Sequence, residues 1–284
     1  MSIISVFRQS KSHQKSSFNH LFSCNEITNQ NSSFNKNLNQ KNIVITLNED
    51  NDFVTYHFSR NEENTLLKKR IEARSEFLDK AAREAYQNHK INEKLELEKI
   101  GIHKKIRTVL QSKKEQLRKE FLICFGNTNR DELIKHFKSP SELANACLKG
   151  SIAILNKKGL SKQNLISLVF HLDEAGLPHC HVIFNDFSFD KNTTATQIAI
   201  KKYSDKDKKT QYKLRILEFS EYQDLLANEM QLTRGEKGSR RKHLDIQNYK
   251  NLKESEDVTK LTKKSIFKSA TYLRQQRQKD LTIK

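Results

Sequence analysis

The chain has 284 residues, 35% of them hydrophobic, and its 52 lysines and arginines against 34 acidic residues give a formal net charge of +18. This length allows one large domain or two ordinary ones with a buried core, which excludes a short peptide or a disordered tail. The excess of cations favours a partner with a negative surface. No segment approaches the roughly 20 consecutive apolar residues of a membrane helix, and the N-terminus lacks the apolar run of a signal peptide, so we expect a cytoplasmic protein.

Five apolar, β-branched runs predict strands in chain order. The expected strands are Ile3–Phe7, Ile43–Leu47, Phe121–Phe125, Asn164–Leu172 and His179–Phe187. The polar, Asn-rich residues 25–42 separate the first two and are typical of a long loop.

Helical spacing of apolar residues predicts the helices. Residues 62–120 contain no proline and a single glycine among dense charge, which predicts one or two long amphipathic helices that break or bend at Gly101. A further helix is expected after Ser139 or Ser141 as N-cap, with Pro140 in its first turn. Another is expected around residues 218–230.

The four cysteines form no CxxC pair, which predicts reduced thiols rather than a disulfide framework or a zinc ribbon. They are Cys24, Cys124, Cys147 and Cys180.

The most informative stretch is residues 164–187, NLISLVFHLDEAGLPHCHVIFNDF. Its two strand-like runs, separated by DEAGLP, predict an antiparallel hairpin. Strand alternation places His179 and His181 on one face of the second strand, and His171 lies opposite one of them if a six-residue loop closes the pair. Directly opposed residues project to the same side of a sheet, so three imidazoles are expected to converge.

Converging imidazoles meet the requirements of a divalent metal site, with neutral ring nitrogens at about 2.0–2.2 Å from one ion. Asp173 and Glu174, at the mouth of the hairpin, could orient the histidines as hydrogen-bond acceptors or join the coordination. A structural zinc site that includes Cys180 is disfavoured because alternation points this residue to the opposite face. The alternative is that the three histidines are ordinary surface or core residues.

Residues 232–243, LTRGEKGSRRKH, form a second cluster, whose glycines let backbone N–H groups approach phosphate closely. We expect its cations to contact a DNA backbone, and a solvated basic turn is the alternative. The five cations are Arg234, Lys237, Arg240, Arg241 and Lys242. Residues 201–215 add seven cations, two anions and two tyrosines, Tyr203 and Tyr212, that could stack on unpaired bases.

The run from His171 to His181, HLDEAGLPHCH, resembles the HxDE…PHxH signature of the Mob/Pre plasmid mobilization relaxases (MobV type), which belong to the HUH endonucleases. The downstream LTRGEKGSRRKHLDIQNYK is similar to the RGxKGSxxKH segment that this family carries after its metal motif. Two motifs in the right order make the resemblance specific. It predicts a catalytic domain over residues 1–249, which includes the charged helical segment 62–120, and a basic helical tail over residues 250–284.

The resemblance implies an α+β fold, in which a central antiparallel sheet of about five strands carries the metal hairpin in its middle and helices on one face; the five predicted strands agree with it. It implies site- and strand-specific nicking and rejoining of single-stranded or hairpin plasmid DNA at an origin of transfer, through a covalent link to the 5′ phosphate. The expected cofactor is a divalent ion, Mn²⁺ or Mg²⁺, held by His171, His179 and His181, with Glu174 as a catalytic residue and Asp173 as an orienting one. Homodimerisation and contact with the coupling protein of a conjugative system are expected of such an enzyme.

The nucleophile of this family lies near the N-terminus and can be a histidine. SSFNHLFSCNEIT resembles the family's N-terminal FxH segment, which makes His20 the predicted nucleophile, through a phosphoramidate-type intermediate. His13 and Tyr56 stay open as alternatives. A rolling-circle replication initiator or transposase-type HUH nuclease would instead use a downstream tyrosine, Tyr222 or Tyr249. A non-catalytic DNA-binding protein would use the histidines only structurally and would bind DNA in a salt-sensitive way without cutting it.

Overall fold

The computed structural model describes residues 4–9, 42–58, 64–110, 117–126, 130–172 and 178–234. All of them belong to the first of two compact units, which spans residues 1–237. No helix within these ranges is both long enough and apolar enough to cross a membrane.

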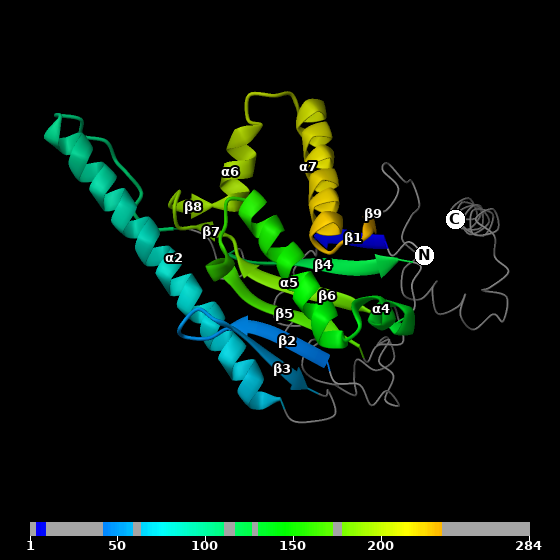
Figure 1. The fold of residues 1–284 in the computed structure, drawn as a ribbon. Coiled ribbons are helices and arrows are strands. Elements are labelled where there is room, and N and C mark those ends of the chain that lie inside the picture. Colours follow the sequence, from blue (N-terminus) through cyan, green and yellow to red (C-terminus); the bar gives the residue numbers. More distant parts are fainter. Residues whose placement is uncertain are drawn as a thin grey trace, which may run out of the picture. The chain divides into compact units, whose positions relative to one another are not determined.

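A seven-stranded sheet with the order β3-β2-β5-β6-β4-β1-β9 forms the centre of this unit (Figure 1). Its strands are β1 (Ile4–Gln9), β2 (Asn42–Leu47), β3 (Phe53–Phe58), β4 (Arg118–Gly126), β5 (Leu165–His171), β6 (His179–Asn185) and β9 (Thr233–Arg234). Neighbouring strands are antiparallel except β1 and β9, which are parallel. The β5–β6 hairpin lies in the middle of the sheet, so the predicted α+β fold with a central antiparallel sheet is confirmed.

All five predicted strands are present, and β3 and β9 are additional. β3 follows β2 through a tight turn in which the Asn48 side chain accepts a hydrogen bond from the Asp52 N–H at 2.8 Å. Asn51 has a φ of 64°, a left-handed conformation that asparagine tolerates better than most residues. The segment NEDND thus closes a hairpin between two strands.

The helices are α2 (Thr65–Lys99), α4 (Arg130–Phe137), α5 (Pro140–Lys157), α6 (Ala195–Lys202) and α7 (Lys208–Glu229). A 3₁₀ turn, η2 (Lys162–Asn164), precedes β5, and a small hairpin of β7 (Phe187–Ser188) and β8 (Thr193–Thr194) precedes α6. α5 begins as predicted: the Ser139 hydroxyl accepts a hydrogen bond from the Glu142 N–H at 3.1 Å, and Pro140 occupies the first turn.

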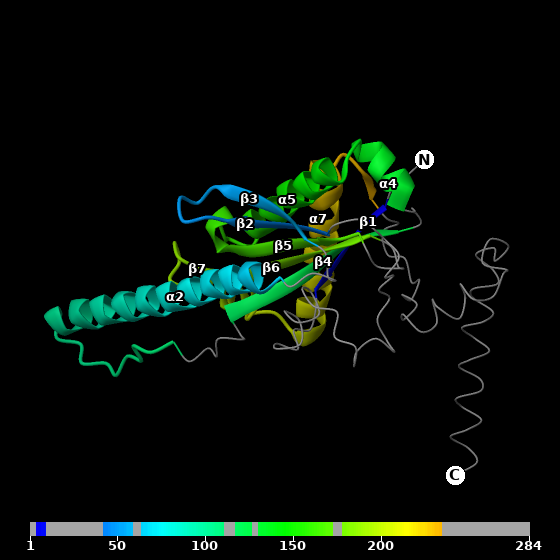
Figure 2. The same cartoon turned by 90° about the horizontal axis from the view of Figure 1, so that it is seen from below.

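Helices cover both faces of the sheet (Figure 2). The expectation of helices on one face only is therefore wrong. α5 and the end of α7 pack on one face over a large core that includes Phe121, Phe125, Leu168 and Phe170. α2 packs on the other face over a smaller cluster, formed by Val44, Phe58, Ile71, Leu78, Ile166, Val169 and Ile183.

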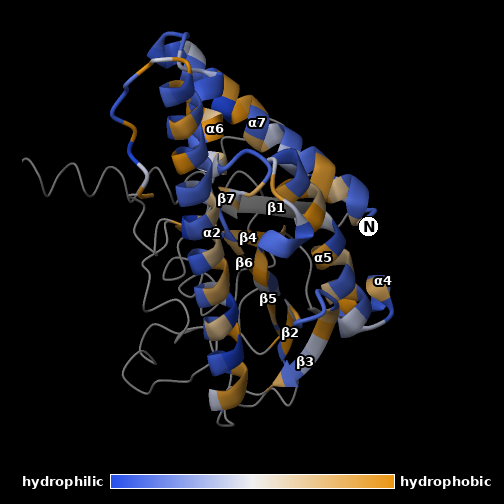
Figure 3. Ribbon diagram, turned by 90° about the vertical axis from the view of Figure 1, so that its left-hand side faces the viewer, coloured by the Kyte–Doolittle hydropathy of each residue, from blue (hydrophilic) through white to orange (hydrophobic). Residues whose placement is uncertain are grey.

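The helix predicted within residues 62–120 is present only in its first part. α2 ends at Lys99, and Gly101 has a φ of 76°, a left-handed conformation that ends a helix at no steric cost for glycine. Residues 102–110 have no regular structure, and Arg118 already lies in β4, so the prediction of helix up to Glu120 is wrong. Figure 3 shows hydrophilic and hydrophobic residues alternating along α2, and only one stripe of the helix is buried. That buried stripe consists of Ile71, Ser75, Leu78 and Ala82.

Candidate metal centre

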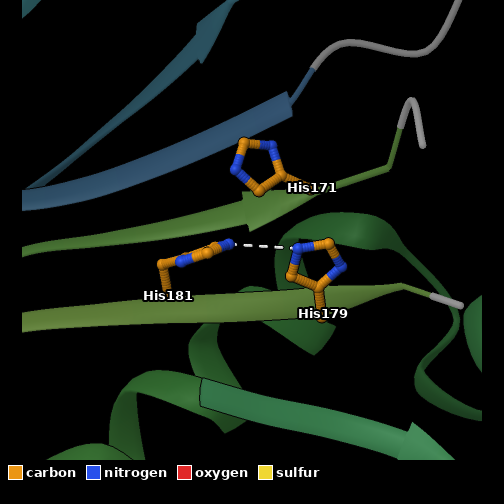
Figure 4. A group of neighbouring side chains, drawn as sticks. All are labelled: His171, His179 and His181. Carbon is orange, nitrogen blue, oxygen red and sulfur yellow. Dashed lines mark hydrogen bonds between the residues drawn. The ribbon is translucent and has the colours of Figure 1, made fainter. Parts of the chain in front are cut away.

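Three histidines converge at the end of the β5–β6 hairpin (Figure 4). His171, the last residue of β5, lies directly opposite His179, the first residue of β6, and His181 follows two residues later on the same face. One ring nitrogen of each histidine lies within 4.8 Å of the others. His171 and His181 are buried and His179 is half-buried. The sequence-predicted convergence is therefore present.

The spacing of two of the rings fits a single ion. Nε2 of His179 and Nε2 of His181 are 3.1 Å apart. Two nitrogens bound at about 2.1 Å are about 3.0 Å apart at a right angle and about 3.4 Å apart at a tetrahedral angle, so both atoms suit one ion. A set of neutral imidazoles binds several first-row divalent ions, so these three residues alone do not select one of them.

A carboxylate that the sequence analysis did not select orients one of these rings. Nδ1 of His181 is hydrogen-bonded to Oε1 of Glu120 on β4, and both side chains are about nine-tenths buried, with 10% and 9% exposed. A carboxylate on Nδ1 keeps the proton on that nitrogen and leaves the Nε2 lone pair for an ion. Glu120 thus has, for His181, the acceptor role that the sequence analysis expected of Asp173 or Glu174.

The strand register explains how Glu120 reaches the site. In β4, Leu122 pairs with His181 and Glu120 pairs with Ile183, so Glu120 lies diagonally beside His181 on the same face. The signal in the sequence was a carboxylate directly before the buried run FLICF, at a position whose alternation could have been continued backwards from the strand.

A hydrogen bond also holds the backbone just after His171 in place. The Asn42 side chain, at the start of β2, accepts a hydrogen bond from the Leu172 N–H at 2.8 Å, and Asn42 is fully buried. This bond holds the end of β5 against the neighbouring strand and so fixes the backbone that carries His171. Asn42 closes the Asn-rich segment and was assigned to a loop by the sequence analysis.

Cys180 lies on the opposite face from the histidines, in the large core, as alternation predicts. Burial raises the pKa of its thiol well above the usual range. Both observations argue against a zinc site that includes this sulfur. Cys124, Cys147 and Cys180 form no disulfide, whereas Cys24 lies outside the described residues.

Arg234, predicted to contact DNA, is bound to α7. Its guanidinium donates to Asp224 Oδ1 at 2.8 Å, and to Ser220 Oγ and Gln223 Oε1 at 3.0 Å each. Its side chain is only 13% exposed. In this position Arg234 fixes β9, and with it the start of the basic segment, against α7.

Tyr56, an alternative nucleophile, lies far from the histidines. It pairs with Val44, which pairs with Val169, which pairs with His181. Three strand spacings amount to about 14 Å. In addition, the Tyr56 hydroxyl accepts a hydrogen bond from Arg70, whose guanidinium carbon lies 5.4 Å from the ring centre. This position does not suit attack on a phosphate held at the histidines.

Tyr222, the candidate nucleophile if the protein were a replication initiator, lies in the core on the other side of the sheet. It is 3% exposed, and Nζ of Lys158 lies 4.8 Å from its ring centre. Burial and Glu218 raise the pKa of its hydroxyl. A buried phenol on the far side of the sheet cannot reach DNA at the three histidines.

Tyr212, one of the two tyrosines expected to stack on bases, is exposed on α7, whereas Tyr203 is buried, so the expectation that Tyr203 stacks on a base is wrong. The remaining selected residues lie outside the part of the chain that the structure describes. They are His13, His20, Asp173, Glu174, Lys237, Arg240, Arg241, Lys242 and Tyr249.

Comparisons with known proteins agree with the two motifs. Residues 5–251 match the model of a family described as plasmid recombination enzyme, Mob_Pre. Three crystal chains of the MobM relaxase domain, Mn-bound and in complex with plasmid pMV158 oriT DNA, are similar in structure. One is 15% identical and covers 88% of this chain and 98% of its own, with a TM-score of 0.42. Another is 16% identical and covers 87% and 98%, with a TM-score of 0.46. No curated protein matches the sequence.

Proposed function

The chain belongs to the Mob/Pre family of plasmid recombination enzymes, and on this basis we propose that it is a plasmid mobilization relaxase that nicks and rejoins one strand of DNA at an origin of transfer. The observation that carries the proposal is the convergence of His171, His179 and His181 on one sheet face, within 4.8 Å. This arrangement belongs to the motif that resembles the family signature.

We propose that His171, His179 and His181 hold a divalent ion, Mn²⁺ or Mg²⁺. When bound there, such an ion supplies Lewis-acid polarisation of the scissile phosphate and offsets the charge that develops on its oxygens. The chain's own contribution is to fix the donors: Glu120 holds the proton of His181 on Nδ1, and Asn42 holds the backbone after His171. Glu174 as a catalytic residue and Asp173 as an orienting one stay part of the proposal.

His20 is the proposed nucleophile. A ring nitrogen attacks phosphorus, the bond to the 3′ oxygen of the preceding nucleotide breaks, and that oxygen takes a proton to leave a free 3′ hydroxyl. The 5′ phosphate stays on the enzyme as a phosphoramidate, and reversal of the same step rejoins the strand without ATP. The positions of Tyr56 and Tyr222 support a nucleophile from the N-terminal segment, because neither tyrosine lies near the histidines.

We also propose the domain division at residue 249, which is supported by a family match that ends at residue 251.

The DNA backbone would be contacted by Lys237, Arg240, Arg241 and Lys242. Arg234 would act by holding the start of their segment against α7. A cytoplasmic location, homodimerisation and a conjugative coupling protein stay predictions.

The test is cleavage of labelled single-stranded DNA that carries the origin region, with and without Mn²⁺. We expect a metal-dependent nick with a protein-linked 5′ end, lost in His20→Ala and His179→Ala. His136→Ala is the matched control because His136 is exposed on α4, which lies with α5 on the other side of the sheet.

Two other results of this experiment would each contradict one part of the proposal. Cleavage that survives His20→Ala but not His179→Ala would show that the nucleophile assignment is wrong while the metal site stands. Binding of origin DNA without any cleavage, whatever the ion, would favour the non-catalytic DNA-binding protein.

A further inference from the structure

The first half of α7, residues 208–219, carries an exposed apolar stripe. Tyr212, Ile216 and Phe219 recur at a spacing of four and three residues and so lie along one side of the helix. Their exposed fractions are 68%, 51% and 38%. The second half of the helix, in contrast, buries Tyr222, Leu226 and Ala227 in the unit. A helix that is anchored at one end therefore presents large apolar side chains to solvent at the other.

Cations flank this stripe on both sides. At 100° per residue, Lys209 and Lys213 lie along one border of the stripe and Lys208 and Arg215 along the other. All four are exposed, and within the described ranges none of them forms a salt bridge. Their charge is therefore available to a ligand.

The two acids just before α7 are engaged elsewhere, and Glu218, three residues after Arg215 on the helix, lies outside the stripe. Asp207 is the N-cap of α7 and accepts from the Lys209 N–H at 2.9 Å and the Thr210 N–H at 3.0 Å. Asp205 forms a salt bridge with Lys206 at 2.7 Å. Residues 201–215, with seven cations and two anions, thus present a strongly positive surface.

The combination favours single-stranded nucleic acid over other anionic partners. Tyr212 offers a flat ring face on which a base can stack, and the flanking cations match a backbone that carries one charge per nucleotide. Figures 2 and 3 show that the first half of α7 lies towards the same side of the sheet as α2, which is the side of the histidines.

We propose that the outer face of residues 208–219 binds single-stranded DNA beyond the cleavage site, with Tyr212 stacking on a base and Lys209 and Lys213 contacting phosphates. The inference rests on the proposed function for the identity of the DNA as origin DNA. The contact itself requires no cleavage.

The test measures binding of fluorescently labelled single-stranded origin DNA by anisotropy at several salt concentrations, with oligonucleotides extended in either direction from the nick. For the extended DNA we expect Lys209→Gln with Lys213→Gln to weaken binding about tenfold. The same pair should reduce the slope of log K against log salt by about 1.4, because each lost contact with a single strand contributes about 0.7. A short oligonucleotide that covers only the nick region should bind parent and variant equally.

The matched control is Lys80→Gln with Lys94→Gln on α2. It makes the same change in net charge at exposed lysines, which face Glu84 and Glu98 at 3.9 and 3.5 Å. We expect less than a twofold effect. Tyr212→Ala should weaken binding about tenfold, and Tyr212→Phe should restore it, because phenylalanine retains the stacking face. Light-induced crosslinking of bromodeoxyuridine-substituted DNA should map to Tyr212.

The outcomes separate this inference from the proposed function. If DNA is never cut but the Lys209 and Lys213 variant still weakens binding, the proposed function fails and the α7 surface stands. If the parent cuts DNA and both lysine pairs give equal affinity and slope, the inference is wrong. Binding to vesicles of anionic lipid that depends on Lys213, with unchanged affinity for DNA, would also overturn it in favour of a membrane surface.

Discussion

The two faces of the central sheet are built from the same strands and have opposite characters. On β6, Cys180, Val182 and Phe184 enter the large core beneath α5 and α7. The alternating residues His179 and His181 lie on the other face, where α2 packs over Val44, Phe58, Ile166, Val169 and Ile183. The difference shows how one strand serves both tasks: burial on one side fixes the backbone, which keeps polar side chains on the other side in defined positions.

Removal of divalent ions should affect the histidine face of the sheet strongly and the large core on the other face very little. We expect treatment with a chelator to reduce origin cleavage by about 10³-fold or more, because the Lewis-acid contribution amounts to several kcal/mol. The thermal midpoint should change by only a few degrees, because the large core does not depend on the ion. Cleavage and circular dichroism measured on the same sample check this. A cooperative loss of structure on chelation would instead indicate a structural metal and would contradict the division of tasks.

Phe170→Ala should destabilise the large core on the face of the sheet that α5 covers. Phe170 is fully buried and packs edge-on against Phe125, with ring centres 6.4 Å apart. We expect the free energy of unfolding to fall by about 3–5 kcal/mol, measured by urea denaturation, because a large cavity replaces the ring. Leu217→Ala is a control for apolar truncation, since Leu217 is 58% exposed and should change stability by less than about 0.5 kcal/mol.

Glu120→Gln should affect the histidine face alone. An amide in place of the carboxylate still fills the space but no longer accepts the Nδ1 proton of His181 as a charged group. We expect the Mn²⁺ concentration for half-maximal cleavage to rise about 10- to 100-fold, the usual effect of losing a carboxylate behind a ligating histidine. Full activity at saturating Mn²⁺ would support a positioning role. An unchanged Mn²⁺ requirement would show that the contact does not orient the ligand.

The smallest effect concerns Asp186, after the end of β6. Burial raises the pKa of its carboxyl, against hydrogen bonds from Thr196 and the nearby Lys119 and Lys158. Because the native state holds this proton more tightly than the unfolded chain, Asp186 contributes most stability at low pH and loses it as pH rises through its native pKa. Asp186→Asn lacks this titration. The difference in thermal midpoint between parent and variant should therefore shift in favour of the variant, by a few degrees, between acidic and neutral pH. A constant difference across this range would contradict the prediction.

Local patterns predicted the elements that carry the site. The alternation of His171, His179 and His181 in two apolar runs was enough to predict their convergence, because a hairpin has only two faces. The start of α5 was predictable for the same local reason, since Ser139 and Pro140 are cap residues. Family motifs added the activity, which neither charge nor periodicity specifies.

Features that depend on distant pairing were not predicted. Glu120 meets His181 across 61 positions of sequence, through the β4–β6 register, which no local pattern reveals. Arg234 was assigned to DNA because its neighbours are basic, but three acceptors on α7 bind it in the fold. The helix in residues 62–120 was extended too far because dense charge without proline resembles a helix even where no surface supports one.

The parallel pairing of β9 with β1 sets a lower limit for shortening the protein. β1 pairs with β4 on one side, and among the residues that the structure describes its other side pairs only where Ile4 and Ser5 meet Thr233 and Arg234. A version that stops before residue 233 would leave the outer edge of β1 open to pairing with another molecule, and so would favour aggregation. Any minimal fragment prepared for crystallisation should therefore extend past Arg234, even if the residues that follow are dispensable.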